Sequence, residues 1–309
     1  MTIDLPLVAF QALNGLQLGV MLFLMAAGLT LVFGIMNLIN LAHGSLYMVG
    51  AYLAAAFQGW TGSFVLGALL AIPATLALGV AVELVVLRTL YERDHLDQVL
   101  ATFGLILFFN EAVRIVWGPS ALFMTTPAFL SGQIELPLGI VYPSYRFAIL
   151  AVGLAVAAFL YGLIGHTRIG MLIRAGATNR AMVGALGVDV KLLYTAVFAL
   201  GAALAGVAGL MAGPILSVES GMGEPILILT FVVIVIGGIG SIRGAFLAAL
   251  LIGVVDTLGR SFLPGLLRAV FNPEVANAAG PALASMLIYV LMALVLAFRP
   301  QGLFPARGA

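Results

Sequence analysis

Long apolar runs dominate this chain, and short polar or charged steps separate them. From Leu5 to Val82 there is no Asp, Glu, Lys or Arg. A helix that crosses the hydrocarbon core of a bilayer needs about 20 apolar residues. The pattern therefore predicts an all-α, polytopic bundle of membrane-spanning helices.

Eight apolar segments are long enough to cross a membrane. They are Val8–Gly34, Leu38–Phe57, Ser63–Leu87, Gln98–Trp117, Arg146–Gly165, Leu192–Gly213, Ile226–Gly259 and Pro281–Phe298. The seventh would be about 51 Å long as one helix, which exceeds the bilayer. We interpret it as two short spans joined by an inner turn, whose residues are Gly237, Gly238, Gly240, Arg243 and Gly244. The expected number of spans is about eight to ten, and nine fits best.

Basic residues predict on which side of the membrane each loop lies, because Lys and Arg are enriched in cytoplasmic loops. The stretch His166–Lys191 has four basic residues and one acid, which predicts a cytoplasmic loop. The loops Gly118–Tyr145 and Pro214–Pro225 have acids and no Lys or Arg, so we expect them outside. The N-terminus is then outside, and the C-terminus, with Arg299 and Arg307, is cytoplasmic.

The composition agrees with one membrane domain over residues 1–309, with the loop 166–191 inside it. The chain is 63% hydrophobic and 8% charged, whereas soluble proteins have about 25% charged residues. No basic patch lies outside the loops, so a nucleic-acid partner is not expected. The start, MTIDLPL, lacks a positive region, so we expect the first span to be retained.

Small residues recur every four positions along the sixth span, on one face of the helix. They are Gly201, Ala205, Gly209 and Gly213. This spacing is typical of tight helix packing in lipid, which we favour over a role in substrate binding. Gly15 and Gly19 have the same spacing in the first span. No internal repeat is evident, so an inverted-repeat carrier has no support.

Polar side chains gather near the start of the second span. Asn40, His43 and Tyr47 would share one helix face, with Asn37 and Ser45 nearby. Such groups must face the bundle interior or a wet cavity. They are candidates for the substrate pathway, and a purely structural role for His43 stays equally open.

Few other charged residues fall within or near the spans. We expect Glu111 and Arg114 to neutralise each other, and a role in receiving a zwitterionic solute is the alternative. Glu83 and Asp256 look isolated, and isolated acids could relay protons.

Several kinds of chemistry are missing from the sequence. The single lysine, Lys191, follows Val190 and does not belong to a phosphate-binding GxxxxGK[ST] loop. The chain has no cysteine, and its three histidines lie far apart, so we expect no metal and no cofactor in this chain. Ser45 could suggest an intramembrane hydrolase, but no base is evident for it. We do not expect an enzyme.

Four segments, in order, resemble the permeases of ABC importers for branched-chain amino acids, in particular the LivH-like high-affinity permeases. They are Gly28–Tyr52, the stretch Gly170–Val188, Val235–Gly253, and RPQGLFP at Arg299–Pro305. The resemblance covers nearly the whole chain. It implies the membrane subunit of an importer in the bacterial inner membrane.

The resemblance also implies partners: a second, LivM-like permease, two cytoplasmic ATPases that bind ATP and Mg²⁺, and a periplasmic binding protein. It assigns ATPase coupling to Gly170, Arg174, Ala175, Asn179, Arg180, Ala185 and Gly187. Relatives often have an acid or amide pair where this chain has Asn179 and Arg180.

A short interfacial helix over about Met171–Leu186 would suit a docking role. Its Arg174 and Arg180 would face acids of the ATPase, while Ala175, Met182 and Leu186 would pack toward the bundle. Two alternatives remain. One is a permease for urea or short amides, which shares much of the Gly28–Tyr52 pattern, and the other is a stand-alone ion-coupled carrier that uses His43, Glu83 and Asp256.

Overall fold

A computed structural model describes residues 5–269 and 271–304 of the chain. Asp4, Pro305 and Arg307 lie outside the described residues. Within them the α-helices are α1 Leu5–Met36, α2 His43–Thr61, α3 Phe64–Val85, α4 His95–Trp117, α5 Ser144–His166, α6 Arg168–Thr178, α7 Arg180–Ala185, α8 Val190–Ala212, α9 Gly223–Gly237, α10 Ile242–Leu267 and α11 Pro273–Phe298. The short elements are the 3-10 turns η1 Leu87–Leu90, η2 Ala128–Leu130 and η3 Pro137–Gly139, and the strands β1 Gln133–Leu136 and β2 Ile140–Pro143.

The helices α1 to α5 and α8 to α11 fall on the predicted spans. In the described part of the chain, seven of them are long and apolar enough to cross a membrane. The other two are α2 and α9, and α9 has 15 residues, about 22 Å, less than the thickness of the hydrocarbon core. The fold is a polytopic helical membrane bundle.

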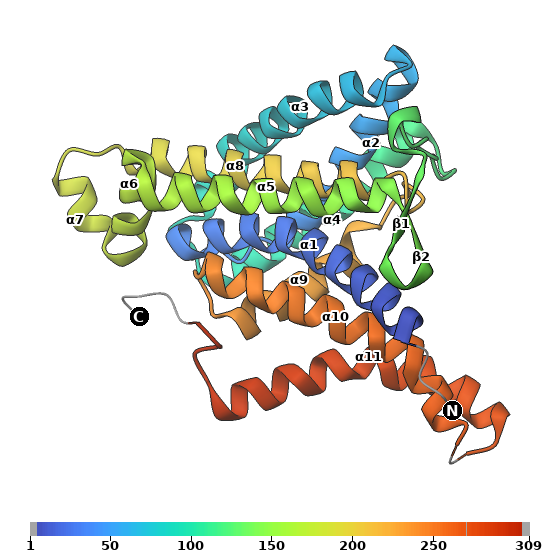
Figure 1. The fold of residues 1–309 in the computed structure, drawn as a ribbon. Coiled ribbons are helices and arrows are strands. Elements are labelled where there is room, and N and C mark those ends of the chain that lie inside the picture. The colour runs from blue at the N-terminus through green and yellow to red at the C-terminus, as the bar shows by residue number, and fades with distance from the viewer. Residues whose placement is uncertain (1–4, 270, 305–309) are drawn as a thin grey trace.

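The bundle has two distinct ends, which Figure 1 shows at right and left. The β1–β2 hairpin marks one, which we call the hairpin end, and α6 and α7 mark the other, which we call the α6–α7 end. Helix α1 begins at the hairpin end, and α11 finishes at the α6–α7 end. This arrangement agrees with an odd number of crossings.

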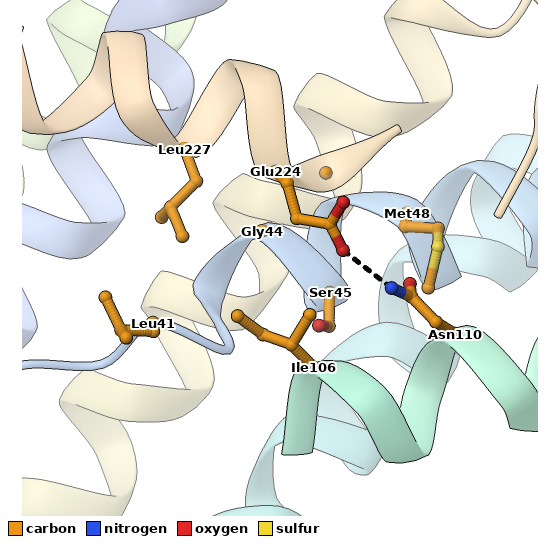
Figure 2. Close-up of a pocket in the computed structure, with 9 residues that line it drawn as sticks. Leu41, Gly44, Ser45, Met48, Ile106, Asn110, Glu224 and Leu227 are labelled. Atoms are coloured by element: carbon orange, nitrogen blue, oxygen red, sulfur yellow. Dashed lines mark hydrogen bonds between the residues drawn. The ribbon is translucent and has the colours of Figure 1, made fainter. Parts of the chain in front are cut away.

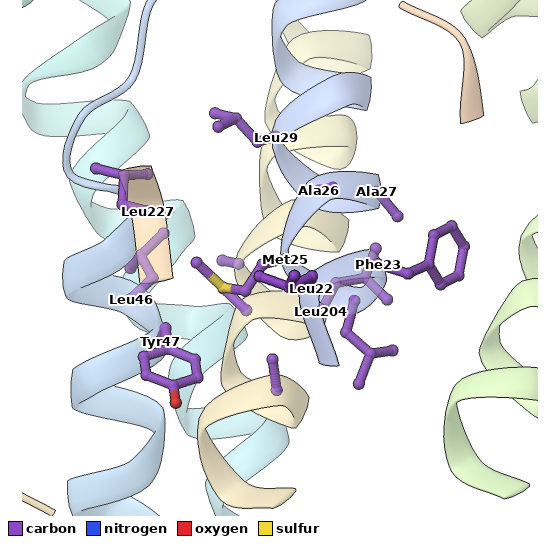
Figure 3. Close-up of a cluster of buried hydrophobic side chains, with 14 of the residues drawn as sticks. Leu22, Phe23, Met25, Ala26, Ala27, Leu29, Leu46, Tyr47, Leu204 and Leu227 are labelled. Atoms are coloured by element: carbon purple, nitrogen blue, oxygen red, sulfur yellow. The ribbon is translucent and has the colours of Figure 1, made fainter. Parts of the chain in front are cut away.

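Helix α1 forms the centre of the core. It is apolar on all sides, as expected for a helix that is surrounded by others. From Val20 to Val32 every residue is buried, and Figure 3 shows its side chains packed against Leu46 and Tyr47 of α2 and Leu204 of α8.

Glycines let α1 and α10 approach to backbone contact. A Cβ atom on Gly19 would lie 2.7 Å from the carbonyl oxygen of Ala249, and one on Gly15 would lie 2.7 Å from Cα of Val254. Such distances are shorter than van der Waals contact, so these positions require glycine. Small residues at helix crossings are a general feature of packing in membranes.

The inner turn separates α9 from α10, where the sequence predicts a break. Gly238 and Gly240 have φ angles of 103° and 79°, which glycine adopts without steric cost. The C-terminal segment folds back onto this turn, because the amides of Leu303 and Phe304 donate to the carbonyls of Ile236 and Gly237 at 2.8 and 3.0 Å. The C-terminal segment therefore stabilises the inner turn through these hydrogen bonds.

Two other residues stabilise the same turn. A Cβ atom on Gly244 would overlap the backbone of Gly237, so the two glycines set how closely α9 and α10 pack. The guanidinium carbon of Arg243 lies 5.6 Å from the ring centroid of Tyr161 in α5, within range of a cation–π interaction.

A short antiparallel hairpin lies in the loop between α4 and α5. β1 pairs with β2, and Gln133 is opposite Pro143. The sequence predicts only a loop here, because strands of four residues are too short to produce a clear alternating pattern.

Candidate functional site

The α6–α7 element, residues 168–187, projects from one end of the bundle (Figure 1). Side-chain caps define its boundaries. The hydroxyl of Thr167 accepts from the Gly170 amide at 3.1 Å, and Asn179 Oδ1 accepts from the Met182 amide at 3.0 Å. Asp189 caps α8 by accepting from Lys191 and Leu192. These caps satisfy amides that the first turn of a helix leaves unpaired.

The expectation of one helix over about Met171–Leu186 is wrong. The chain forms two helices, because Asn179 has an extended backbone (φ −153°) and starts α7 as its cap. Asparagine is a favourable N-cap and a poor residue inside a helix. Gly187, with a φ angle of 85°, then reverses the chain after α7.

The expected inward face of this element is also wrong. Ala175 is exposed, and Met182 and Leu186 are 59% and 76% exposed. The buried residues are Gly170, Ile173, Gly176 and Val183. At Gly170 a Cβ atom would lie 2.5 Å from the carbonyl oxygen of Ile164, so glycine lets α6 fold back on α5.

The charged side chains of the element are free to meet a partner. Arg174 and Arg180 are exposed, and neither forms an ion pair with an acid in the described part of the chain. Ala185 and Gly187 are exposed as well. The element thus presents exposed apolar side chains and three exposed arginines, Arg168, Arg174 and Arg180, on one projection.

Helix α2 begins inside the bundle, at His43, and not at its end. The His43 side chain is fully buried, and its Nε2 lies 3.2 Å from the carbonyl oxygen of Met25, well before α1 ends at Met36. The chain therefore returns from the end of α1 to the bundle interior in a non-helical stretch, residues 37–42. Asn37, exposed and with a φ angle of 51°, makes the reversal.

Three of the pathway candidates are enclosed by packed helices at this break. Asn40 and His43 are fully buried, and Tyr47 is 1% exposed. Both polar atoms of the Asn40 side chain, and Nδ1 of His43, lack a hydrogen-bond partner within the described residues. Buried polar atoms without partners are costly. The prediction that these residues line a pathway stays a prediction.

Ser45 lies on the other side of α2 and lines a crevice between α2, α4 and α9 (Figure 2). The lining residues are Leu41, Gly44, Ser45, Met48, Ile106, Asn110, Gly223, Glu224 and Leu227. Asn110 Nδ2 donates to Glu224 Oε1 at 2.6 Å. The crevice is too narrow to admit a water molecule in this conformation.

Asn110 and Glu224 were not among the sequence candidates. Glu224 is one of the acids that place the loop Pro214–Pro225 outside. One signal could have found Glu224: it is an acid in the first turn of α9, a helix too short to span the bilayer. Broken helices often surround transport sites, because their ends leave polar backbone groups free.

The sequence suggests that Glu83 is an isolated acid, and this interpretation is wrong. Its fully buried carboxylate accepts from Arg88 Nε and Nη2, both at 3.3 Å, and from Thr195 of α8 at 2.8 Å. The Tyr91 hydroxyl also donates to it. Burial raises the pKa of Tyr91, and the hydrogen bond to Glu83 raises this pKa further. The cluster joins the end of α3 to the start of α8.

Asp256 and Glu111, the other acids that the sequence analysis places within or near the spans, are also paired. Asp256 accepts from Arg260 at 2.9 Å, one helical turn away, so the interpretation of Asp256 as an isolated acid is wrong. Glu111 and Arg114 form an exposed ion pair at 3.1 Å. Neither pair leaves a free buried carboxylate for a proton relay.

The small residues of α8 lie at helix crossings. A Cβ atom on Gly201 would lie 3.2 Å from the carbonyl oxygen of Gly28 in α1. Gly209 is against Tyr47 of α2, and Gly213 is against Met124. Ala205 is fully buried.

A bundle of apolar helices that is broken at its centre and projects an amphipathic element at one end has the architecture of a membrane transport subunit. Residues 11–296 match the family described as "Branched-chain amino acid transport system / permease component". The chain belongs to this family. It is a membrane translocation component and not an enzyme.

Curated relatives agree with this assignment. The high-affinity branched-chain amino acid transport system permease protein BraD of Pseudomonas aeruginosa is 32% identical, over 95% of this chain and 94% of its own length. LivH of Escherichia coli is 30% identical, over 82% of this chain and 86% of its own. The ribose import permease RbsC of Escherichia coli is 28% identical over 75% and 72%. No solved structure matches the chain.

Proposed function

We propose that this chain is one membrane subunit of an ATP-driven importer for branched-chain or related hydrophobic amino acids. A second permease completes the translocation unit, and two cytoplasmic ATPase subunits bind ATP and Mg²⁺ and drive it. A periplasmic binding protein delivers the substrate at the hairpin end. The membrane is the bacterial inner membrane.

The observation that carries this proposal is the exposed surface of the α6–α7 element. Ile169, Met171, Met182 and Leu186 are each more than half exposed, and the same element has three arginines that form no ion pair within the described residues. Exposed apolar side chains that gather on a projection favour a protein partner. Since the chain lacks a nucleotide-binding loop, an ATPase that docks here would supply the energy.

The orientation follows from charge. The α6–α7 end has Arg168, Arg174, Arg180 and Lys191, and basic loops remain in the cytoplasm. The α6–α7 element and the end of α11 are then cytoplasmic, and the start of α1 is outside.

The substrate class rests on the relatives, which are named for branched-chain amino acids at 30–32% identity. Nothing among them supports urea or short amides. An ion-coupled carrier is disfavoured because Glu83 and Asp256 are held in ion pairs.

The test uses the double variant Met182→Glu and Leu186→Glu, reconstituted with the second permease, the ATPases and the binding protein. Two carboxylates on the apolar contact should reduce co-purification of the ATPases at least about tenfold, since interface residues of this kind contribute over 1 kcal/mol each. ATP-dependent leucine uptake should fall in parallel.

The matched control is Phe123→Glu, which places a carboxylate at an 81% exposed aromatic position near the hairpin end. It should leave ATPase co-purification unchanged. Full co-purification and uptake by the double variant would contradict the docking assignment. Because the chain has no native cysteine, Leu186→Cys and Phe123→Cys can be labelled from either side of the membrane to check the orientation.

A further inference from the structure

We propose that the crevice between α2, α4 and α9 is a binding site for one zwitterionic amino acid in transit. The inference rests on the proposed function and adds the place and the chemistry of substrate recognition. The polar side of the crevice would take the ammonium and carboxylate groups, and the apolar side would take the aliphatic side chain (Figure 2).

Two helices begin at this crevice, and neither start has a side-chain cap. Ala42 before α2 and Met222 before α9 make no capping hydrogen bond. The starts touch, since a Cβ atom on Gly44 would lie 2.5 Å from the carbonyl oxygen of Gly223. The start of a helix carries about half a positive charge, which favours a carboxylate.

Ser45 provides a second and independent observation. The residue is 4% exposed and lines the crevice, and its hydroxyl forms no hydrogen bond within the described residues. The hydroxyl is therefore available to a solute in the crevice. A substrate carboxylate at the start of α2 would give this hydroxyl an acceptor.

Glu224 and Asn110 provide the site for the ammonium group. Asn110 donates its amide to Oε1 of Glu224, which leaves the amide oxygen of Asn110 and Oε2 of Glu224 as acceptors. A second bond, from the Ser220 hydroxyl to the Asn110 carbonyl at 3.1 Å, holds the loop before α9 against α4. An ammonium group needs such a set of oxygen acceptors.

The remaining walls are apolar. Leu41, Met48, Ile106 and Leu227 complete the lining of the crevice, and the last three are buried. A branched aliphatic side chain would replace contacts among these residues with contacts of its own. A pocket of apolar walls with a few convergent polar groups is the usual form of a small-molecule site.

The charges favour a zwitterion over other solutes. Two helix starts contribute about one positive charge in all, and the Glu224 carboxylate balances it. A net cation or anion would leave an unbalanced charge inside the membrane, which is costly. An amino acid adds one charge of each sign. Because the crevice is closed here, α4 and α9 must separate for a solute to enter.

The first experiment measures leucine uptake and ATP hydrolysis by the reconstituted complex. Glu224→Gln can still accept from Asn110, so the fold is retained, but it removes the charge that faces the ammonium group. Uptake should fall about tenfold to a hundredfold, the range for a hydrogen bond to a charged group. ATP hydrolysis stimulated by the binding protein should stay within about twofold.

Glu219→Gln is the matched control, because Glu219 lies in the same loop but is exposed and does not line the crevice. It should transport leucine at the wild-type rate. Ser45→Ala is a second variant and should lower uptake severalfold. Normal uptake by both Glu224→Gln and Ser45→Ala would overturn the site, while ATP-dependent uptake by the wild type would leave the proposed function intact.

A second experiment reads binding without transport. Ser45→Cys places a single thiol in the crevice of a chain that has no other cysteine. Leucine should slow its reaction with a small methanethiosulfonate reagent severalfold, and urea should not. The exposed Phe123→Cys thiol should react at one rate with or without leucine. An absence of ATP-dependent uptake by the wild type would refute the proposed function, and the leucine effect on Ser45→Cys would still decide the site.

Discussion

The close approach of α1 and α10 makes a quantitative prediction about Gly19. In Gly19→Ala the new methyl group would lie 2.7 Å from both the Ala249 carbonyl oxygen and Cα of Leu250. Both atoms belong to backbone, which cannot rotate away as a side chain can. The helices must therefore move apart, and overpacking of this kind costs about 1–3 kcal/mol.

The matched control is Gly162→Ala in α5, where a Cβ atom has no neighbour within 4 Å. Both substitutions gain the same helix propensity, about 1 kcal/mol. Their difference therefore isolates the packing cost. Gly162→Ala should be as stable as the wild type or more stable, and Gly19→Ala should be less stable than Gly162→Ala by about 1–3 kcal/mol.

The assay is thermal unfolding in detergent, followed by tryptophan fluorescence at one scan rate, because unfolding of a membrane protein is often irreversible. The difference in free energy corresponds to a midpoint that is lower by about 5 °C in Gly19→Ala than in Gly162→Ala. Equal midpoints for the two variants would mean that α1 and α10 are not in backbone contact.

Two smaller predictions concern the α6–α7 end. Because the pKa of Tyr91 is raised in the folded protein, stability should be constant below pH about 10 and fall as the pH rises above it. Tyr91→Phe should flatten that fall, and an unchanged slope in unfolding midpoints between pH 8 and 11 would contradict it. Asn179→Ala should lose about 1 kcal/mol of capping and speed amide exchange at Met182 about fivefold. Asn179→Asp, which keeps the cap, should exchange like the wild type.

Hydropathy predicted most of the fold, because each long helix had to be apolar along its whole length. Hydropathy did not separate the non-helical stretch after Met36 from α2. Leu38, Ile39 and Leu41 are as apolar as the residues of a membrane-spanning helix, so the predicted span begins at Leu38. The break at His43 depends on a hydrogen bond to Met25, a residue on another helix. The hydropathy of one segment contains no information about a contact with another helix.

The errors at the α6–α7 element have a different cause. Apolar residues of an amphipathic segment usually face the bundle, and the inward orientation expected for Met182 and Leu186 rests on that rule. A subunit of a larger assembly can keep apolar side chains exposed for a partner. Asn179 is assigned only to ATPase coupling by the resemblance, although the preference of asparagine for N-cap positions could have predicted two helices.

Some ion pairs can be predicted from the spacing of acids and bases along the sequence, and others cannot. Asp256 and Arg260 are four residues apart on one helix, a spacing that alone predicts an ion pair. Glu83 and Arg88 are five residues apart, across the end of α3, so only the fold brings them together. Thr195, from a distant segment, completes the cluster.

Chain connectivity makes α8 the structural link between the α6–α7 element and the centre of the bundle. α8 follows α7 within a few residues, and its second turn is tied to α3 through the hydrogen bond from Thr195 to Glu83. Farther along, Gly209 lies against Tyr47 of α2, one turn from the crevice. A partner that displaced α7 would have to break these contacts or move α8, and α8 could not move as a rigid helix without moving the start of α2. The helix therefore joins the proposed docking surface to the proposed substrate site.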